Sequence, residues 1–133
     1  MTEGRVGAPV GAEPVGRGWR AFFWAACVYN LVIGALGMLS PEATVDARIV
    51  CLLVLCFGIV YLLVARDPRR FAPTLWAGLI GKAGVVGLLG PAAFAPGGEP
   101  LIAGILIGDA LFALGFLVFL LTRGEDNWGR EKA

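Results

Sequence analysis

The sequence predicts an all-α integral membrane protein, folded as a bundle of four transmembrane helices with both termini in the cytoplasm. Of its 133 residues, 58 % are hydrophobic and 16 % are charged, and the mean hydropathy is +0.79. Soluble proteins average about 45–50 % apolar and about 25 % charged residues. A short soluble chain exposes much of its surface, and this chain has too few charged side chains to cover it. Lipid is therefore the expected solvent.

Four apolar segments are long enough, at about 1.5 Å per residue, to cross a hydrocarbon core about 30 Å thick. Leu, Val and Ala dominate these segments without a period-two alternation, so a β-barrel has no support. The second segment has 17 residues and no charge, and the third is apolar apart from Lys82. The predicted spans are residues 21–39, 49–65, 74–94 and 101–122, within a transmembrane domain of residues 19–123.

The chain on either side of this domain is polar. Residues 1–18 have almost no bulky apolar side chains, so they cannot offset the entropy of ordering and are predicted to be disordered. Residues 124–133 form a polar C-terminal tail of the same character. An alternative interpretation of the first span is a signal peptide that ends near residues 35–37. We favour a span because the basic region would be about twenty residues long and Asn30 would interrupt the apolar run.

The distribution of basic residues predicts the orientation, because Lys and Arg near the ends of spans are retained on the cytoplasmic side. One side of the predicted topology receives only Arg48, and Lys82 lies within a span. This bias places both termini in the cytoplasm, in a bacterial cytoplasmic (inner) membrane, and argues against insertion of the same chain both ways up. The other side receives the remaining nine basic residues: Arg5, Arg17, Arg20, Arg66, Arg69, Arg70, Arg123, Arg130 and Lys132.

Several classes of chemistry have no support in the sequence. The net charge of +1 gives no reason to expect a nucleic-acid partner. The chain has no histidine, which removes imidazole metal sites, histidine-ligated haem and histidine acid–base chemistry. Cys27, Cys51 and Cys56 have neither redox nor zinc spacing and are interpreted as small apolar fillers. We predict no catalytic residue, no metal site and no cofactor.

Each predicted span contributes one polar side chain at a similar depth, and together they form a predicted intramembrane polar layer. A charge within a span costs about 2.5 to 3.5 kcal/mol on insertion scales, so Lys82 and Asp109 are the natural pair. Counting from the span ends leaves an offset of ~6 Å, which a lysine bridges directly or through another polar group. Three interpretations remain: an ion pair that sets the register of the bundle, a ligand or proton site, and a Lys82 that snorkels to the surface. The layer consists of Asn30, Tyr61, Lys82 and Asp109.

Glycine recurs at every third position of the third span, which predicts a groove without side chains that slips around the helix. Another helix or the tail of a ligand could lie in it, and helix contact is the favoured use. Gly104 and Gly108 in the fourth span also have the small-x-x-x-small spacing of helix contacts. The groove consists of Gly78, Gly81, Gly84, Gly87 and Gly90.

The order of these features resembles small four-span bacterial inner-membrane proteins of the DoxX-like kind, over about residues 20–122. The resemblance implies a four-helix membrane fold and no particular chemistry, so no catalytic residue is carried over. The residues that carry it are Tyr29, Asn30 and Gly34; Gly58, Tyr61, Asp67, Pro68 and Arg70; Gly81 and Lys82; and Gly108, Asp109 and Phe112.

These features favour a non-enzymatic membrane protein that binds a lipid-like small molecule or a partner helix in the glycine-rich groove. The expected partners are membrane lipids and a homo-oligomer or larger membrane-protein complex. The alternative is a small proton- or ion-coupled transporter that uses Asp109 and Lys82. An aspartate that moves between apolar surroundings and a nearby ammonium can gain or lose a proton. An enzyme that acts on lipids is the third hypothesis.

Overall fold

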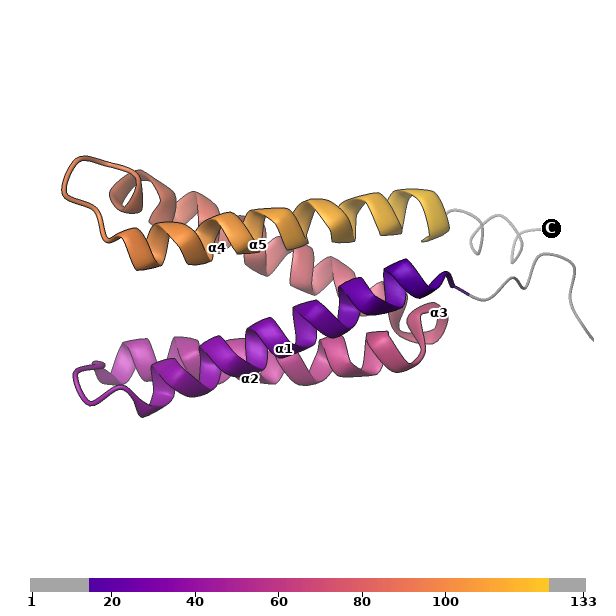
Figure 1. Cartoon of the computed structure of the whole chain (residues 1–133), viewed down its shortest axis with the longest axis horizontal. Helices are drawn as coiled ribbons and strands as arrows, with labels where there is room; N and C mark the ends of the chain where they lie inside the picture. The colour runs from indigo at the N-terminus through magenta and orange to yellow at the C-terminus, as the bar shows by residue number, and fades with distance from the viewer. Residues whose placement is uncertain (1–14, 125–133) are drawn as a thin grey trace, which may run out of the picture.

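The computed structural model describes residues 15–124, and this part of the chain is helical with no strand. Each of its four long helices runs antiparallel to the long helix that precedes it in the chain (Figure 1). The four segments that contain them are each long and apolar enough to cross a membrane, which confirms the predicted all-α, multi-pass architecture. The elements are α1 (Arg17–Leu39), α2 (Val45–Arg66), α3 (Pro68–Phe71), the 3₁₀ turn η2 (Ala72–Thr74), α4 (Leu75–Ala93), α5 (Pro100–Phe119) and the π-helical turn η3 (Leu120–Gly124).

The first two helices begin before the predicted apolar runs, because polar turns beside an apolar segment can be as helical as the segment itself. The second helix begins at Val45 rather than residue 49, and Thr44 caps it by accepting a hydrogen bond from the N–H of Ala47 at 3.2 Å. Arg48 therefore lies in the first turns of α2 rather than in a loop, and its guanidinium donates to the carbonyl of Ser40 at 3.2 Å.

The first helix begins at Arg17, inside the segment 1–18 for which the composition predicts disorder. The rest of that prediction, apart from Val15 and Gly16, falls on residues 1–14, and the predicted polar tail, apart from Gly124, falls on residues 125–133. Both of these segments lie outside the described residues.

The turn between the second and third spans is built by Asp67 and Pro68. The α2 helix ends at Arg66, and Pro68 occupies the first position of α3, where its missing N–H is not needed. The Asp67 carboxylate accepts a hydrogen bond from the N–H of Arg70 at 3.3 Å and so caps α3. The short α3 and η2 then lead the chain into α4.

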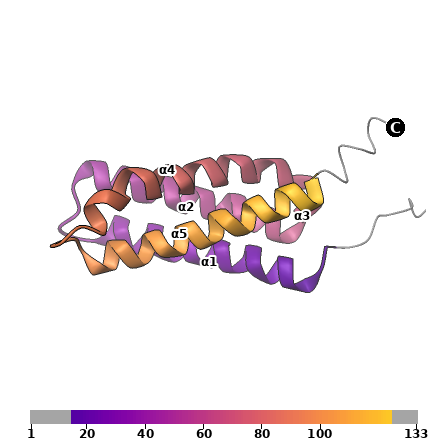
Figure 2. The same ribbon diagram turned by 90° about the horizontal axis from the view of Figure 1, so that it is seen from above.

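The helices form two hairpins, α1 with α2 and α4 with α5 (Figures 1 and 2). Glycines allow the first hairpin to pack closely. A Cβ atom on Gly34 would lie 2.7 Å from the backbone nitrogen of Leu55, and one on Gly58 would lie 2.8 Å from the Leu31 side chain. Small residues at such positions let helix backbones approach one another in a membrane.

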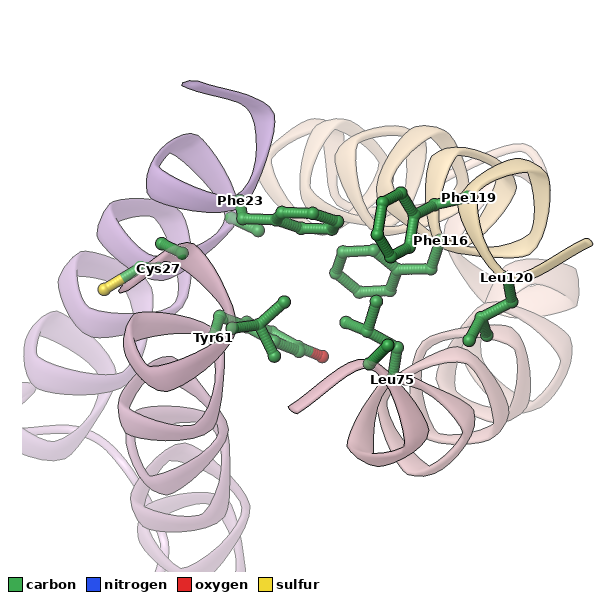
Figure 3. Packing of buried hydrophobic residues seen from close by; sticks show 11 residues of the cluster. Phe23, Cys27, Tyr61, Leu75, Phe116, Phe119 and Leu120 are labelled. Atoms are coloured by element: carbon green, nitrogen blue, oxygen red, sulfur yellow. The ribbon is translucent and has the colours of Figure 1, made fainter. Parts of the chain in front are cut away.

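The hairpins meet at the end of the bundle that carries α3 and diverge toward the loops at residues 40–44 and 94–99 (Figure 1). Buried aromatic rings from different helices fill this meeting point (Figure 3). The rings of Phe23 and Phe119 stand edge to face at 4.9 Å between centroids, and Tyr61 and Phe116 lie 5.0 Å apart. The buried core consists of Phe23, Ala26, Cys27, Tyr61, Val64, Ala65, Ala72, Leu75, Phe116, Phe119 and Leu120.

Large apolar side chains near the loop end of the bundle are exposed instead. Leu39, Leu88 and Leu101 are 79 %, 83 % and 74 % exposed, respectively. A soluble protein does not leave so many leucines in water, whereas a lipid-embedded helix presents them to acyl chains. The packed core therefore lies in one half of the bundle, whereas apolar side chains face outward along its whole length.

Candidate functional site

Lys82 and Asp109 form a buried ion pair at the inner edge of the aromatic core. Lys82 lies in the second turn of α4, and its Nζ donates a hydrogen bond to Oδ1 of Asp109, on α5, at 2.6 Å. The side chains are only 7 % and 13 % exposed. The offset of ~6 Å expected from counting residues along straight helices is closed in the folded chain, so the two groups meet without an intermediary.

Asn30 connects this pair to the first hairpin. Its Oδ1 accepts a second hydrogen bond from Lys82 Nζ at 2.9 Å, and its Nδ2 donates to the carbonyl of Val54, in α2, at 3.1 Å. One connected set of hydrogen bonds therefore joins all four long helices. Every buried side-chain nitrogen and oxygen among the described residues has a hydrogen-bond partner, as a low-dielectric interior requires.

Three aromatic rings surround the Lys82 ammonium. Its Nζ lies 5.3 Å from the ring centroid of Tyr29 and 5.6 Å from the centroids of both Tyr61 and Phe112. Each distance is within the range of about 6 Å over which a ring face attracts a cation. We refer to Asp109, Asn30 and these three rings together as the ammonium cage.

Contacts with other helices hold two of the rings in position. The hydroxyl of Tyr29 donates to the carbonyl of Ile105 at 2.6 Å, and Gly108 leaves the space into which that hydroxyl fits. Tyr61 is 1 % exposed and lies against Gly78 of α4. A Cβ atom at Gly78 would be 2.6 Å from the Tyr61 hydroxyl, so only glycine fits there without displacing the ring.

The structure brings together all four residues of the predicted polar layer and adds two that the prediction omitted, Tyr29 and Phe112. Asn30 and Lys82 touch directly, Lys82 and Asp109 are paired, and the Tyr61 ring faces the ammonium. Tyr29 precedes Asn30, and Phe112 lies three residues after Asp109, nearly one turn further along α5. Their nearness in sequence to layer residues is the only signal for them, and it does not fix where their rings point.

The burial and pairing of Lys82 are incompatible with the interpretation that it snorkels to the membrane surface. An unpaired charge at this depth would cost about 2.5 to 3.5 kcal/mol on insertion scales. Pairing with Asp109 offsets much of this cost, so Lys82 does not need to reach the membrane surface. The Asp109 carboxylate can accept further hydrogen bonds, because only its Oδ1 is hydrogen-bonded and its side chain is 13 % exposed.

The predicted glycine groove is divided between two faces of α4. Gly78 contacts Tyr61, and Gly90 is buried, where an added Cβ atom would meet only Phe94, at 4.0 Å. Gly81, Gly84 and Gly87 are exposed, and a Cβ atom on any of them would meet nothing within 4 Å. Glycines spaced by three slip about 60° around the helix at each step, which carries the middle three away from the bundle interior. We call these three the open glycine face.

Contacts mediated by glycine within the chain lie mainly on other helices. Gly34 and Gly58 lie in the first hairpin, and Gly108 and Gly115 of α5 pack against the rings of Tyr29 and Phe22. Gly104, the other member of the predicted small-x-x-x-small pair, is open. The open glycine face therefore has no packing role among the described residues.

The described residues contain no cluster of three or more His, Cys, Asp or Glu side chains that could hold a metal ion. Cys27, Cys51 and Cys56 are free thiols. The distinctive chemistry of the site is that of its charged pair, which joins the two hairpins through the contacts of Lys82 with Asp109 and Asn30.

Comparisons with protein-family models, curated proteins and solved structures found no match to this chain.

The ion pair can be tested by a double-mutant cycle with Lys82→Met, Asp109→Leu and the combined variant. Each single variant leaves an unpaired buried charge and is expected to lose about 3–5 kcal/mol of stability. The double variant removes both charges and should recover much of that loss, which thermal unfolding in detergent will measure. Small, additive losses in all three variants would contradict a coupled pair.

Proposed function

We propose that this is a non-enzymatic integral membrane protein that binds a lipid-like molecule or a partner helix along the open glycine face of α4. The observation that carries the proposal is the open space at Gly81, Gly84 and Gly87, which no described residue fills. A glycine in a helix costs about 1 kcal/mol relative to alanine in water. Packing explains most of the glycines of the other helices. A contact outside the chain would explain these three.

The rest of the bundle supports a binding surface of this kind. The ammonium cage and the aromatic core fasten α4 to its neighbours through its opposite face, at Leu75, Gly78 and Lys82. An external chain could then lie against the open glycine face without disturbing these contacts. Close approach to backbone is what small residues permit in helix association within membranes, where apolar contact alone gives little net gain.

Filling the open glycine face should abolish binding without unfolding the chain. A Cβ atom at each of these positions meets nothing within 4 Å, so the triple variant Gly81→Leu, Gly84→Leu, Gly87→Leu is expected to be at least as stable to heat in detergent as the wild type. Native mass spectrometry should show loss of any co-purified lipid or oligomer. Gly104→Leu is the matched control, because Gly104 is an equally open glycine on α5. Equal retention of ligand or oligomer in the triple variant would contradict the proposal.

The proposed location is a bacterial cytoplasmic membrane, with both termini inside the cell. The bias of basic residues supports this orientation. The start of α1 and the end of α5 lie at the same end of the bundle as α3, opposite the loops at residues 40–44 and 94–99 (Figure 1). The arginines of α3 and of the first turn of α1 would then meet anionic headgroups, at about 1 kcal/mol each.

Cysteine labelling of intact cells tests the orientation in a background without the three native cysteines. A cysteine at Ala95 in the exposed loop should react with a membrane-impermeant maleimide, and one at Gly16 should react only after permeabilisation. Ala95 is preferred to Gly97, whose φ of 86° strains any other residue. The reverse pattern would invert the topology, and reaction at both positions in intact cells would exclude an even number of spans.

A second candidate function is proton- or ion-coupled transport through Asp109 and Lys82. The observation that favours it is the position of the pair where the two hairpins join, together with the partial exposure of the Asp109 carboxylate. A change in the charge of Asp109 would alter the contacts that hold the hairpins together, and so could couple protonation to their separation.

Asp109→Asn should abolish proton flux if this second function is correct, because an amide keeps the shape of the carboxyl group but does not titrate. Acidification of the lumen of proteoliposomes under an imposed potential measures the flux. Circular dichroism and gel filtration verify that the variant is folded. Glu99→Gln, at an exposed loop position, is the control and should retain wild-type flux. A folded Asp109→Asn variant with unchanged flux would exclude this role.

A further inference from the structure

We infer that the ammonium cage is a binding site for a primary ammonium group and that Lys82 is its resident occupant. The cage surrounds Nζ with a carboxylate oxygen at 2.6 Å, an amide oxygen at 2.9 Å and three aromatic rings. Aromatic faces combined with an anion are the means by which proteins bind organic ammonium ligands. Here the ligand position is filled by a side chain of the same chain.

Contacts that do not involve Lys82 hold Asn30 and the three rings of the cage in place, so this part of the cage is expected to persist when Lys82 is absent. Asn30 is oriented by its donation to Val54, and Tyr29 by its donation to Ile105. The Tyr61 ring packs against Phe116 and Gly78. The Phe112 ring packs against Tyr29 at 5.1 Å between centroids. A binding site whose residues are held by contacts with the rest of the protein needs little reorganisation to accept a ligand.

The geometry selects an aliphatic primary amine among cations. Nζ donates two hydrogen bonds. A quaternary ammonium has no N–H group with which to make them, and an alkali cation has neither an N–H group nor an apolar chain. The methylene groups of Lys82 mark the path that the alkyl chain of a ligand would follow. Two sources present this chemistry in a membrane, namely a soluble alkylamine and the headgroup of phosphatidylethanolamine.

This site lies on the inner face of α4 and is separate from the open glycine face. The inference therefore goes beyond the proposed function, because it names a ligand class for a different part of the molecule. The proposed function and the ammonium-site inference can fail independently. The first is tested by co-purification of a lipid or a partner with the glycine variants, and the second by rescue of variants of Lys82.

Chemical rescue of Lys82→Ala tests the inference. The substitution removes three carbons and the nitrogen, and n-propylammonium contains these same atoms. We expect the thermal midpoint of Lys82→Ala in detergent to rise saturably with n-propylammonium chloride and to recover most of the loss relative to the wild type. The wild type should not respond, because Lys82 already fills the cage. If the variant is recovered poorly, the yield of monodisperse protein purified with and without n-propylammonium is the readout.

Three controls make the result specific. Tetramethylammonium and sodium chloride at the same concentration should not rescue Lys82→Ala, because neither donates hydrogen bonds from an ammonium. The double variant Lys82→Ala, Asp109→Asn should not respond to n-propylammonium, because it lacks the carboxylate. Phe112→Leu in the Lys82→Ala background should raise the half-saturating concentration several-fold. No rescue in either readout, or equal rescue by sodium or tetramethylammonium, would overturn the inference.

Nanodiscs distinguish the two sources of the ammonium. If a lipid headgroup reaches the site, Lys82→Ala will be more stable in phosphatidylethanolamine than in phosphatidylcholine, whose headgroup is quaternary, and the wild type will show no such difference. If n-propylammonium rescues the variant equally in both lipids and the lipids themselves do not differ, the ligand is a soluble amine. Either result supports the ammonium site, provided that the detergent experiment shows rescue.

Discussion

A lysine held by an aspartate inside an apolar bundle is the interaction on which the rest of this structure depends. In lipid, apolar contact between helices gives little net gain, because acyl chains are as apolar as leucine. Polar contacts and close packing must then decide how helices are placed. Lys82 reaches Asp109 on the next helix and Asn30 in the first hairpin, and Asn30 reaches the backbone of α2. Loss of one partner leaves a buried charge, so the relative placement of the two hairpins is tied to this contact.

The aromatic core and the ion pair reinforce each other. Tyr61 belongs to both, since its ring faces the Lys82 ammonium and also packs against Phe116 in the core. Close packing is possible there because Gly78 leaves space for the Tyr61 side chain. Beyond this region, toward the loops, the helices expose leucine and valine to the surroundings. The bundle is thus fastened in one half, and it presents apolar side chains along its whole length.

The α4 helix carries both of the features to which a function is assigned. Gly78 and Lys82 point into the bundle, whereas Gly81 and Gly84 lie on its exposed face. Neighbouring residues on a helix are separated by about 100°, and here Gly81 is exposed whereas Lys82 is buried. A contact on the open glycine face would therefore act on the same helix that places the lysine.

The sequence by itself determined the solvent, the number of spans and the identity of the four polar residues in the layer. These properties depend on composition and on local runs of apolar residues, and a charge in such a run must be paired wherever the helix is placed. Helix ends at Arg17 and Val45 were less predictable, because hydropathy marks the apolar segment and not the capped turns beside it. Only the tertiary structure decided that Tyr29 and Phe112 complete the ammonium cage, and that Gly81, Gly84 and Gly87 face outward while Gly78 faces inward. Those outcomes depend on the rotation of each helix about its own axis, and the long-range contacts made by Lys82, Asn30 and Tyr61 set that rotation.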